Sequence, residues 1–247
     1  MIIDAHMHLG PCRVFDLEIT EDQLLANLDR NEVDVAIVQP FPGAPDPLAV
    51  HDRIAALGAK HPGRIYGLAS LSPHRDQDEY HREVERCVRD LGFVAVKLHT
   101  IGHAVNPLTR DGQLVFETAR ALGVPIMIHT GPGVPFALPS LALPMARKYP
   151  ELPVVLAHSG YAVYTPEAQV AAMVADNVYL ETSWSTSAQV AGLVRALGPE
   201  RVMLGSDLPI NTATELAKYR SVGLADEALN TVFADTAARV FRLPGLG

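Results

Sequence analysis

The chain has 247 residues, of which 48% are hydrophobic and 19% charged, so it can bury a large core and is not composed like a disordered segment. A formal net charge of −8 without a polybasic run argues against binding to nucleic acid or to a membrane surface. No apolar stretch reaches the roughly 18 residues of a membrane helix, and the N-terminus lacks the pattern of a signal peptide. Because Cys12 and Cys87 do not form a metal-type pair, we expect a cytoplasmic enzyme with reduced thiols.

Short apolar runs alternate with amphipathic stretches along the whole chain. Eight runs are almost continuous in valine, isoleucine and leucine, which is typical of parallel strands buried on both faces. They cover residues 1–6, 33–40, 64–71, 93–100, 124–131, 152–160, 178–184 and 201–209. Helix-like segments lie between these runs, and residues 226–243 are predicted to form a final helix on the outside of the strands.

Strands at a spacing of about 30 residues, each followed by a helix, predict an α/β fold of the (β/α)8 TIM-barrel type. A doubly wound sheet is the alternative, but it favours a glycine-rich turn after the first strand, where this chain has HMHLGPC. No linker or low-complexity segment interrupts the chain, so we expect a single domain over residues 1–247.

Two histidines in the first predicted strand raise the question of a metal site. His6 and His8 are two residues apart, so they point to the same side of a strand. Alone, such a pair fits a metal clamp, a surface accident or a buried hydrogen-bonded pair. In a barrel of this type the active site lies at the carboxyl ends of the strands. Those ends also carry Lys97, His99, His129, His158 and Asp207.

Alternation along two later strands supports a shared site at this end. His129 shares a face with Met127, and Asp207 shares a face with Gly205, which leaves room below the carboxylate. Three histidines and one aspartate suit Zn²⁺ with an open position for water. Mn²⁺, Fe²⁺ or Co²⁺ would also be tolerated, because selectivity among these ions depends largely on geometry and supply.

Several motifs resemble those of the amidohydrolase superfamily, and most closely its amidohydrolase 2 branch of metal-dependent hydrolases and decarboxylases. The main ones are DAHMHLG, KLHT, MIHTG, LAHSG and GSDLP. GLASLSP, NVYLETS and ADTAARVF are also similar to that branch, although the family usually has asparagine where this chain has Thr236. The resemblance extends over essentially the whole chain, with the motifs in the expected order.

This resemblance implies a role for each strand-end residue. His6, His8 and His129 become metal ligands, and Asp207 becomes a ligand that also moves protons. His158 becomes a catalytic histidine that polarises the substrate or orients water. A bound Zn²⁺ lowers the pKa of its water to about 7, which would give a nucleophile at neutral pH. We expect one ion per chain.

Other residues are candidates for contacts with the substrate or with the ligands. In some superfamily members a lysine at the position of Lys97 is carboxylated and bridges a second metal, whereas one metal is usual in this branch. His99 shares the face of Lys97. Arg13 offers a fork for a substrate carboxylate. Tyr161 and Trp184 are candidate pocket walls.

These observations favour a metal-dependent hydrolase acting on an amide, ester or lactone of a small molecule. The alternative is a non-oxidative decarboxylase of an aromatic or unsaturated acid, because the same residues serve both reactions. A barrel nuclease is less favoured, since Lys97 stands where those enzymes typically have a metal-bridging glutamate. A structural metal without catalysis is disfavoured, because structural zinc sites usually close all four positions with protein. A homodimer is compatible with the family.

Overall fold

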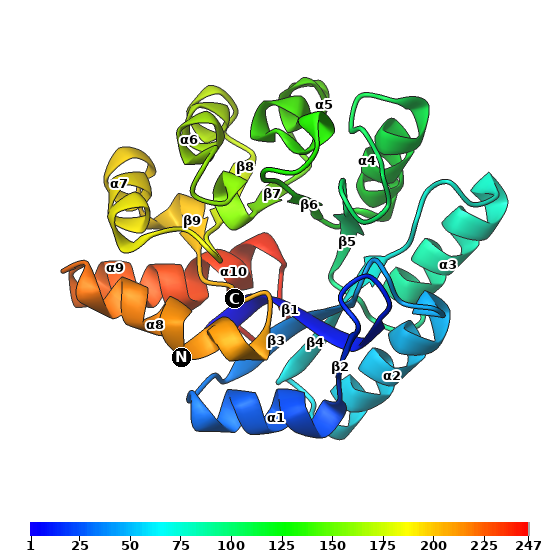
Figure 1. Cartoon of the computed structure of the whole chain (residues 1–247), viewed down its shortest axis with the longest axis horizontal. Helices are drawn as coiled ribbons and strands as arrows, with labels where there is room; N and C mark the ends of the chain where they lie inside the picture. Colours follow the sequence, from blue (N-terminus) through cyan, green and yellow to red (C-terminus); the bar gives the residue numbers. More distant parts are fainter. Residues whose placement is uncertain (247) are drawn as a thin grey trace.

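The computed structural model describes residues 1–246, and all of its strands belong to one curled sheet surrounded by helices (Figure 1). The nine strands follow the order β2-β1-β3-β4-β5-β6-β7-β8-β9, and every pairing is parallel except β1 with β2. Their bounds are β1 (Ile3–Cys12), β2 (Leu17–Ile19), β3 (Val35–Pro40), β4 (Ile65–Ser70), β5 (Ala95–Leu98), β6 (Ile126–His129), β7 (Val154–Ala157), β8 (Val178–Glu181) and β9 (Val202–Met203).

The helices follow the strands in alternation, as the sequence pattern predicts. Their bounds are α1 (Glu21–Arg30), α2 (Pro47–Lys60), α3 (Gln77–Arg89), α4 (Arg110–Leu122), α5 (Leu143–Lys148), α6 (Thr165–Val174), α7 (Ser187–Leu197), α8 (Thr212–Ser221), α9 (Asp226–Asn230) and α10 (Thr236–Val240). Local capping fixes several of their ends. Thr20 and Thr186 each form a capping box with a glutamine three residues later, and α4 ends at Gly123 in the left-handed conformation.

The first strand differs from its prediction. It continues to Cys12 and then pairs with the unpredicted strand β2, because residues 10–12 turn back against Leu17–Ile19 as an antiparallel hairpin. Its register against β3 shifts between Asp4 and Met7, which marks a β-bulge. His6 and His8 therefore lie within β1 and not at its end.

Two apolar layers hold the fold together. One lies between the sheet and the surrounding helices, and the other lines the inner face of the curled sheet with residues such as Ala5, Ile37 and Met127. The predicted final helix is observed as α9, a π-helical turn (Thr231–Asp235) and α10. Val232 and Phe233 pack in the outer layer, whereas Phe241 packs against the inner layer, so our expectation that the tail lies outside the strands holds only for its first part.

The last strand comes close to the first. The amide of Ala5 donates to the carbonyl of Leu204 at 3.0 Å, and the amide of Asp207 donates to the carbonyl of His6 at 2.7 Å. Met7 and Asp207 also form an isolated parallel bridge. The predicted α/β architecture is thus confirmed as a curled parallel sheet, with nine strands where eight were expected.

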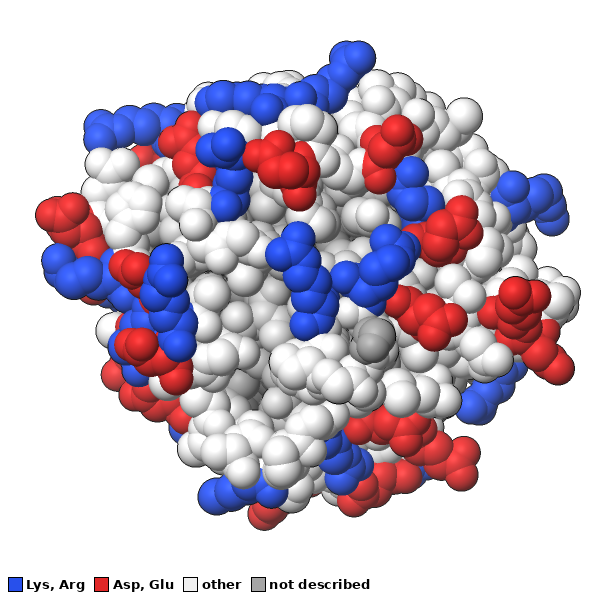
Figure 2. All heavy atoms as spheres, turned by 180° about the vertical axis from the view of Figure 1, so that it is seen from behind, with Lys and Arg blue, Asp and Glu red and all other residues white. Residues whose placement is uncertain are grey.

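On the face seen in Figure 2, basic and acidic side chains are interspersed. Across residues 1–246, no helix combines the length and the apolar character that crossing a bilayer would require.

Candidate metal centre

The inner face of the sheet changes from apolar to polar toward the carboxyl ends of its strands. Along β5, β6 and β8, the alternation places Lys97, His129 and Glu181 on the same side as the inner apolar layer. All three side chains are buried, as are His6, His8 and Gln39. The polar residues therefore meet in a protein interior, where each nitrogen and oxygen needs a partner.

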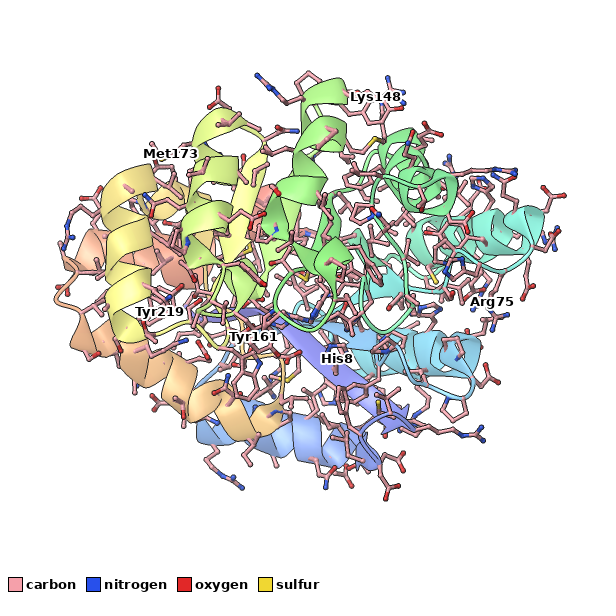
Figure 3. The ribbon with its side chains drawn as sticks, turned by 45° about the horizontal axis from the view of Figure 1, so that its top comes forward. His8, Arg75, Lys148, Tyr161, Met173 and Tyr219 are labelled. Carbon is pink, nitrogen blue, oxygen red and sulfur yellow. The ribbon has the colours of Figure 1, made fainter. Side chains whose placement is uncertain are left out.

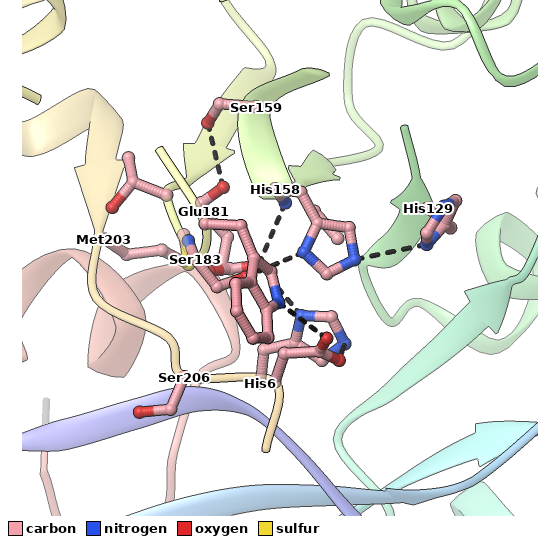
Figure 4. A network of polar contacts seen from close by, with 12 residues as sticks. His6, His129, His158, Ser159, Glu181, Ser183, Met203 and Ser206 are labelled. Atoms are coloured by element: carbon pink, nitrogen blue, oxygen red, sulfur yellow. Dashed lines mark hydrogen bonds and ion pairs between the residues drawn. The ribbon is translucent and has the colours of Figure 1, made fainter. Parts of the chain in front are cut away.

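Glu181 is the anchor of this network (Figure 4). Its Oε2 accepts from His6 Nδ1 at 2.8 Å, from the amide of His158 at 3.1 Å and from Ser183 Oγ at 3.0 Å. Burial raises its pKa, but the hydrogen bond and charge interaction with His6 and the donated amides lower it further, so Glu181 is ionised. Because a carboxylate only accepts, His6 carries its proton on Nδ1 and keeps a lone pair on Nε2.

The same reasoning fixes the protons of two further imidazoles. Ser183 Oγ donates to Glu181, so it accepts from His158 Nδ1 at 2.8 Å. His158 Nε2 then accepts from His129 Nδ1 at 3.1 Å. His129 Nε2 is left with a lone pair, and it is a buried atom without a hydrogen-bond partner in the described chain. Burial lowers the pKa of His129 to about 3, so the ring is neutral at pH 7.

His8 reaches the site from the same strand as His6. Its Nδ1 lies 3.1 Å from the carbonyl of Pro40, which can only accept, so the proton is on Nδ1. Its Nε2 lies 3.2 Å from the Gln39 amide nitrogen and 3.3 Å from Asp207 Oδ1. Burial lowers the pKa of His8 to about 4. His6, His8 and His129 thus all present an Nε2 lone pair.

Asp207 lies four residues beyond the end of β9 in the left-handed conformation, with φ of 66°. Its Oδ1 faces His6 Nε2 at 3.6 Å and His8 Nε2 at 3.3 Å, and its Oδ2 accepts from Trp184 Nε1 at 2.8 Å. Burial raises the pKa of Asp207, but interactions with His158, His8 and His6 bring it well below its usual range. Asp207 is therefore a carboxylate.

Three donor atoms lie close enough together to hold a divalent cation here. The ligand atoms of His6, His8 and Asp207 lie within 4.8 Å of one another. His129 is not one of these three residues, but His158 connects it to them. The ring centroid of His158 lies 4.9 Å from that of His6 and 4.8 Å from that of His129. Imidazole and carboxylate are the donors that transition-metal ions and zinc accept in proteins, and the partnerless Nε2 of His129 is what an absent ligand would leave.

Lys97 is buried beside these atoms. Its Nζ lies 3.1 Å from His6 Nε2 and donates to that lone pair. Burial lowers the pKa of Lys97 to about 8, against the opposing charges of Asp207 and Glu181. Its side chain is not among those that line the cavity at the centre.

A cavity of about 540 Å³ opens over the centre. His8 and Tyr161, which line it, lie toward the middle of the molecule in Figure 3, whereas Arg75, Lys148 and Met173 lie at the periphery. The cavity is lined by apolar and aromatic side chains around the imidazoles, namely His8, Phe15, Leu17, Phe41, Pro42, His99, Ile101, His129, Pro132, Gly133, His158, Tyr161, Trp184, Asp207 and Leu208. The rings of Tyr161 and Trp184 are almost parallel, with centroids 6.2 Å apart.

The structure brings together most of the residues singled out from the sequence. His99, Tyr161 and Trp184 line the cavity with the predicted ligands. Arg13 does not: it follows β1 in an exposed loop and is absent from the cavity wall. Arg13 lies in the turn between β1 and β2, and its side chain is exposed, whereas Phe15 and Leu17 of the same hairpin line the cavity.

Sequence reasoning missed Glu181, Gln39 and Ser183, which orient the histidines. The signal was present as alternation, since Glu181 shares an inner face with Tyr179 and Gln39 shares one with Ile37. What the sequence could not give is the pairing of Glu181 with His6, which lie 175 residues apart.

Comparison with known protein families identifies the family of this chain. A family model described as amidohydrolase matches residues 3–243, which is nearly the whole chain. The chain belongs to the amidohydrolase family. A γ-resorcylate decarboxylase from Polaromonas sp. is 27% identical in sequence to this chain. The alignment covers 71% of this chain and 70% of that relative.

Solved structures show the same fold. The structure of 5-carboxyvanillate decarboxylase from Sphingomonas paucimobilis has a TM-score of 0.79 at 18% identity, covering 98% of this chain and 99% of that one. A dihydroxybenzoic acid decarboxylase from Polaromonas sp., solved with manganese and the inhibitor 2-nitroresorcinol, has a TM-score of 0.76 at 19% identity, covering 98% and 97%.

These comparisons correct the reaction expected from the sequence. Hydrolysis of an amide, ester or lactone was our main interpretation, and it is wrong: both curated relatives are γ-resorcylate decarboxylases, and decarboxylation was the alternative. The physical reason is that a metal beside an aspartate and histidines serves either reaction, so the ligand motifs do not distinguish them.

Proposed function

We propose that the protein is a metal-dependent, non-oxidative decarboxylase of an aromatic acid with a hydroxyl group ortho to the carboxylate. The observation that carries the proposal is the cluster of His6, His8 and Asp207, together with the unpartnered Nε2 of His129, at a cavity of about 540 Å³ with aromatic walls. The relatives support the substrate class, because γ-resorcylate and 5-carboxyvanillate both carry a hydroxyl next to a carboxylate.

His6, His8, His129 and Asp207 are the residues that would hold the ion. A divalent cation bound there supplies a Lewis acid for the oxygens of the substrate. We propose one ion per chain. Zn²⁺ suits the donor set, while a structural neighbour binds manganese, so these are the two ions to compare. The proposal uses Lys97 as an uncarboxylated side chain, whose Nζ, 3.1 Å from His6 Nε2, donates to that nitrogen only while no ion is bound to it.

The chain's own proton carrier in this proposal is Asp207. As a carboxylate, it accepts the proton of the ortho hydroxyl and delivers it to the ring carbon that bears the carboxylate. The bond between that carbon and the carboxylate then breaks, its electron pair returns to the ring, and carbon dioxide leaves. The product is the phenolate, so the proton and the charge balance without an additional reactant.

The remaining residues orient the reactants. Tyr161 and Trp184 bound the space for an aromatic ring and exclude water from it. Both ring nitrogens of His158 are occupied, by Ser183 and by His129. We therefore propose that His158 acts by positioning His129 and not by touching the substrate.

The proposal includes the architecture that forms the site. We propose that the sheet is a closed TIM barrel forming one domain over residues 1–247. The contacts of Ala5 with Leu204 and of His6 and Met7 with Asp207 support closure between the first strand and the segment after the last.

The proposal is tested by measuring carbon dioxide release from 2,6-dihydroxybenzoate, with protein loaded separately with Mn²⁺ and Zn²⁺. We expect turnover with at least one ion, none after chelation, and a loss of at least a hundredfold in Asp207→Asn. Benzoate, which lacks the hydroxyl, should be inert. Metal-loaded protein that releases no carbon dioxide from any ortho-hydroxybenzoate would overturn the proposed function.

A further inference from the structure

The cavity over the candidate metal centre lacks the cationic side chains that usually bind carboxylates. Among residues 1–246, no lysine or arginine lines this cavity: neither the buried Lys97 nor the exposed Arg13 belongs to its wall. A buried or half-buried anion still requires donors, because its unpaired oxygens would otherwise lose their hydration without compensation. The question is which group in the wall supplies an N–H.

The imidazoles of the wall differ in what they present. His8 and His129 present lone pairs, as derived above, and His158 has both nitrogens engaged. His99 is the exception. Its Nδ1 accepts from the amide of Gly102 at 2.9 Å, so in the neutral ring the proton is on Nε2. His99 Nε2 has no hydrogen-bond partner in the described chain. It is not completely buried, so a ligand can reach it.

The orientation of His99 is held from two sides. Its ring stacks on that of His129, with centroids 4.4 Å apart and planes 15° from parallel. Gly102 lies against Pro42, so a Cβ added there would come within 2.3 Å of the proline ring and 3.1 Å of His99 Nδ1. Only glycine allows the loop to approach closely enough for its amide to bond His99. A flip of the ring about the Cβ–Cγ bond would place Cδ2–H against the Gly102 amide and lose this hydrogen bond.

We propose that His99 is the residue that recognises the substrate's carboxylate, through a hydrogen bond from Nε2 to a carboxylate oxygen. The inference rests on the proposed function. The sequence pattern suggested Arg13 as the residue that binds the substrate's carboxylate. We assign this role instead to the neutral Nε2–H of His99, whose orientation is fixed by Gly102. A neutral N–H binds a carboxylate less tightly than a cationic side chain would. The carboxylate can therefore leave more easily as carbon dioxide.

The test compares ligands with and without the recognised group. Trp184 is the chain's single tryptophan and lines the same cavity, so its fluorescence reports binding in metal-loaded protein. The probes are 2-nitroresorcinol, which carries a nitro group at the carboxylate's position, and resorcinol, which carries nothing there. The variants are His99→Phe, which keeps a stacking ring, and His99→Gln, which keeps an N–H. His103→Phe, from the same loop but outside the cavity wall, is the matched control.

We expect His99→Phe to weaken the binding of 2-nitroresorcinol about 10- to 100-fold and to raise the substrate's KM in the decarboxylation assay by a similar factor. The affinity for resorcinol should change less than twofold, metal content should equal wild type, His99→Gln should recover part of the loss, and His103→Phe should match wild type. Equal weakening of both probes, or a lowered metal content in His99→Phe, would overturn the assignment. If wild-type protein turns over the acid and His99→Phe does so with an unchanged KM, only this inference fails. If wild-type protein neither binds the probes nor releases carbon dioxide, the proposed function fails.

Discussion

Trp184 Nε1 donates a hydrogen bond of 2.8 Å to Asp207 Oδ2, and both residues have the left-handed backbone conformation with φ of 66°. Such a backbone is uncommon for residues other than glycine and persists where surrounding contacts enforce it. The backbone amide of Trp184 donates a hydrogen bond of 2.8 Å to Glu215 Oε1. The indole therefore fixes one carboxylate oxygen of Asp207 and leaves the other facing the histidines.

Replacing Trp184 with phenylalanine keeps an aromatic wall but removes this donor. We expect kcat in the decarboxylation assay to fall about tenfold to a hundredfold, because a hydrogen bond to a charged group contributes about 1.5–3 kcal/mol. KM and metal content should change little. The measurement is steady-state kinetics with elemental analysis, and Tyr149→Phe, at the surface, is the control. A variant with wild-type kcat would show that the indole does not orient Asp207.

Replacing Glu181 with glutamine tests whether it fixes the proton of His6. The amide is of similar size, but its N–H₂ cannot accept from His6 Nδ1, so the lone pair on Nε2 is no longer enforced. We expect metal affinity to fall about 10- to 100-fold, as is usual when a group supporting a histidine ligand is lost. Competition with a fluorescent chelator gives the affinity. An unchanged Kd would exclude Glu181 as a determinant of the ligand's orientation.

Metal content and stability should change together. We expect about one divalent ion per chain in gently purified protein, lost in His129→Ala and in Asp207→Ala but kept in His74→Ala, an exposed control. An ion present at a hundredfold excess over its Kd stabilises the fold by about 2.7 kcal/mol. Chelation should therefore lower Tm by roughly 5–10 °C in a chain of this size. If added Mn²⁺ and Zn²⁺ neither bind nor shift Tm, the site has been misassigned.

The architecture and the convergence of histidines were predictable because both depend on periodicity. Alternation along a strand places His129 with Met127 on the inner face, whatever the distant contacts are. Placement of Arg13 was not predictable in the same way. It depends on whether β1 ends early or continues into a hairpin. The end of β1 is determined by its pairing with β2, a strand of only three residues.

The orientation of the ligands needed the structure. Which nitrogen of His6 is free depends on Glu181, and which nitrogen of His129 is free depends on a relay through His158 and Ser183. These contacts join strands far apart in sequence. The reaction needed the comparisons, because the ligand motifs are compatible with either hydrolysis or decarboxylation.

Acid stability offers a test away from the site, at the contact between α2 and α3. Glu83 accepts from His51 Nδ1 at 2.8 Å and from Arg86 Nε at 2.9 Å. Burial raises its pKa, but these two partners lower it further, from 4.5 to about 2. A carboxyl whose pKa is lower in the folded state stabilises the fold above pH 4.5, and that stabilisation is lost as the pH falls toward 2.

The free energy of unfolding should therefore fall by about 1 kcal/mol between pH 5.5 and pH 3.5 on account of Glu83. Glu83→Gln should lower stability at pH 5.5 and flatten this dependence, because the amide does not titrate. Glu79→Gln, on the exposed side of the same helix, should keep the slope of wild type. Urea denaturation of the three proteins at both pH values gives the comparison. If Glu83→Gln retains the full wild-type slope, the acid sensitivity arises elsewhere in the chain.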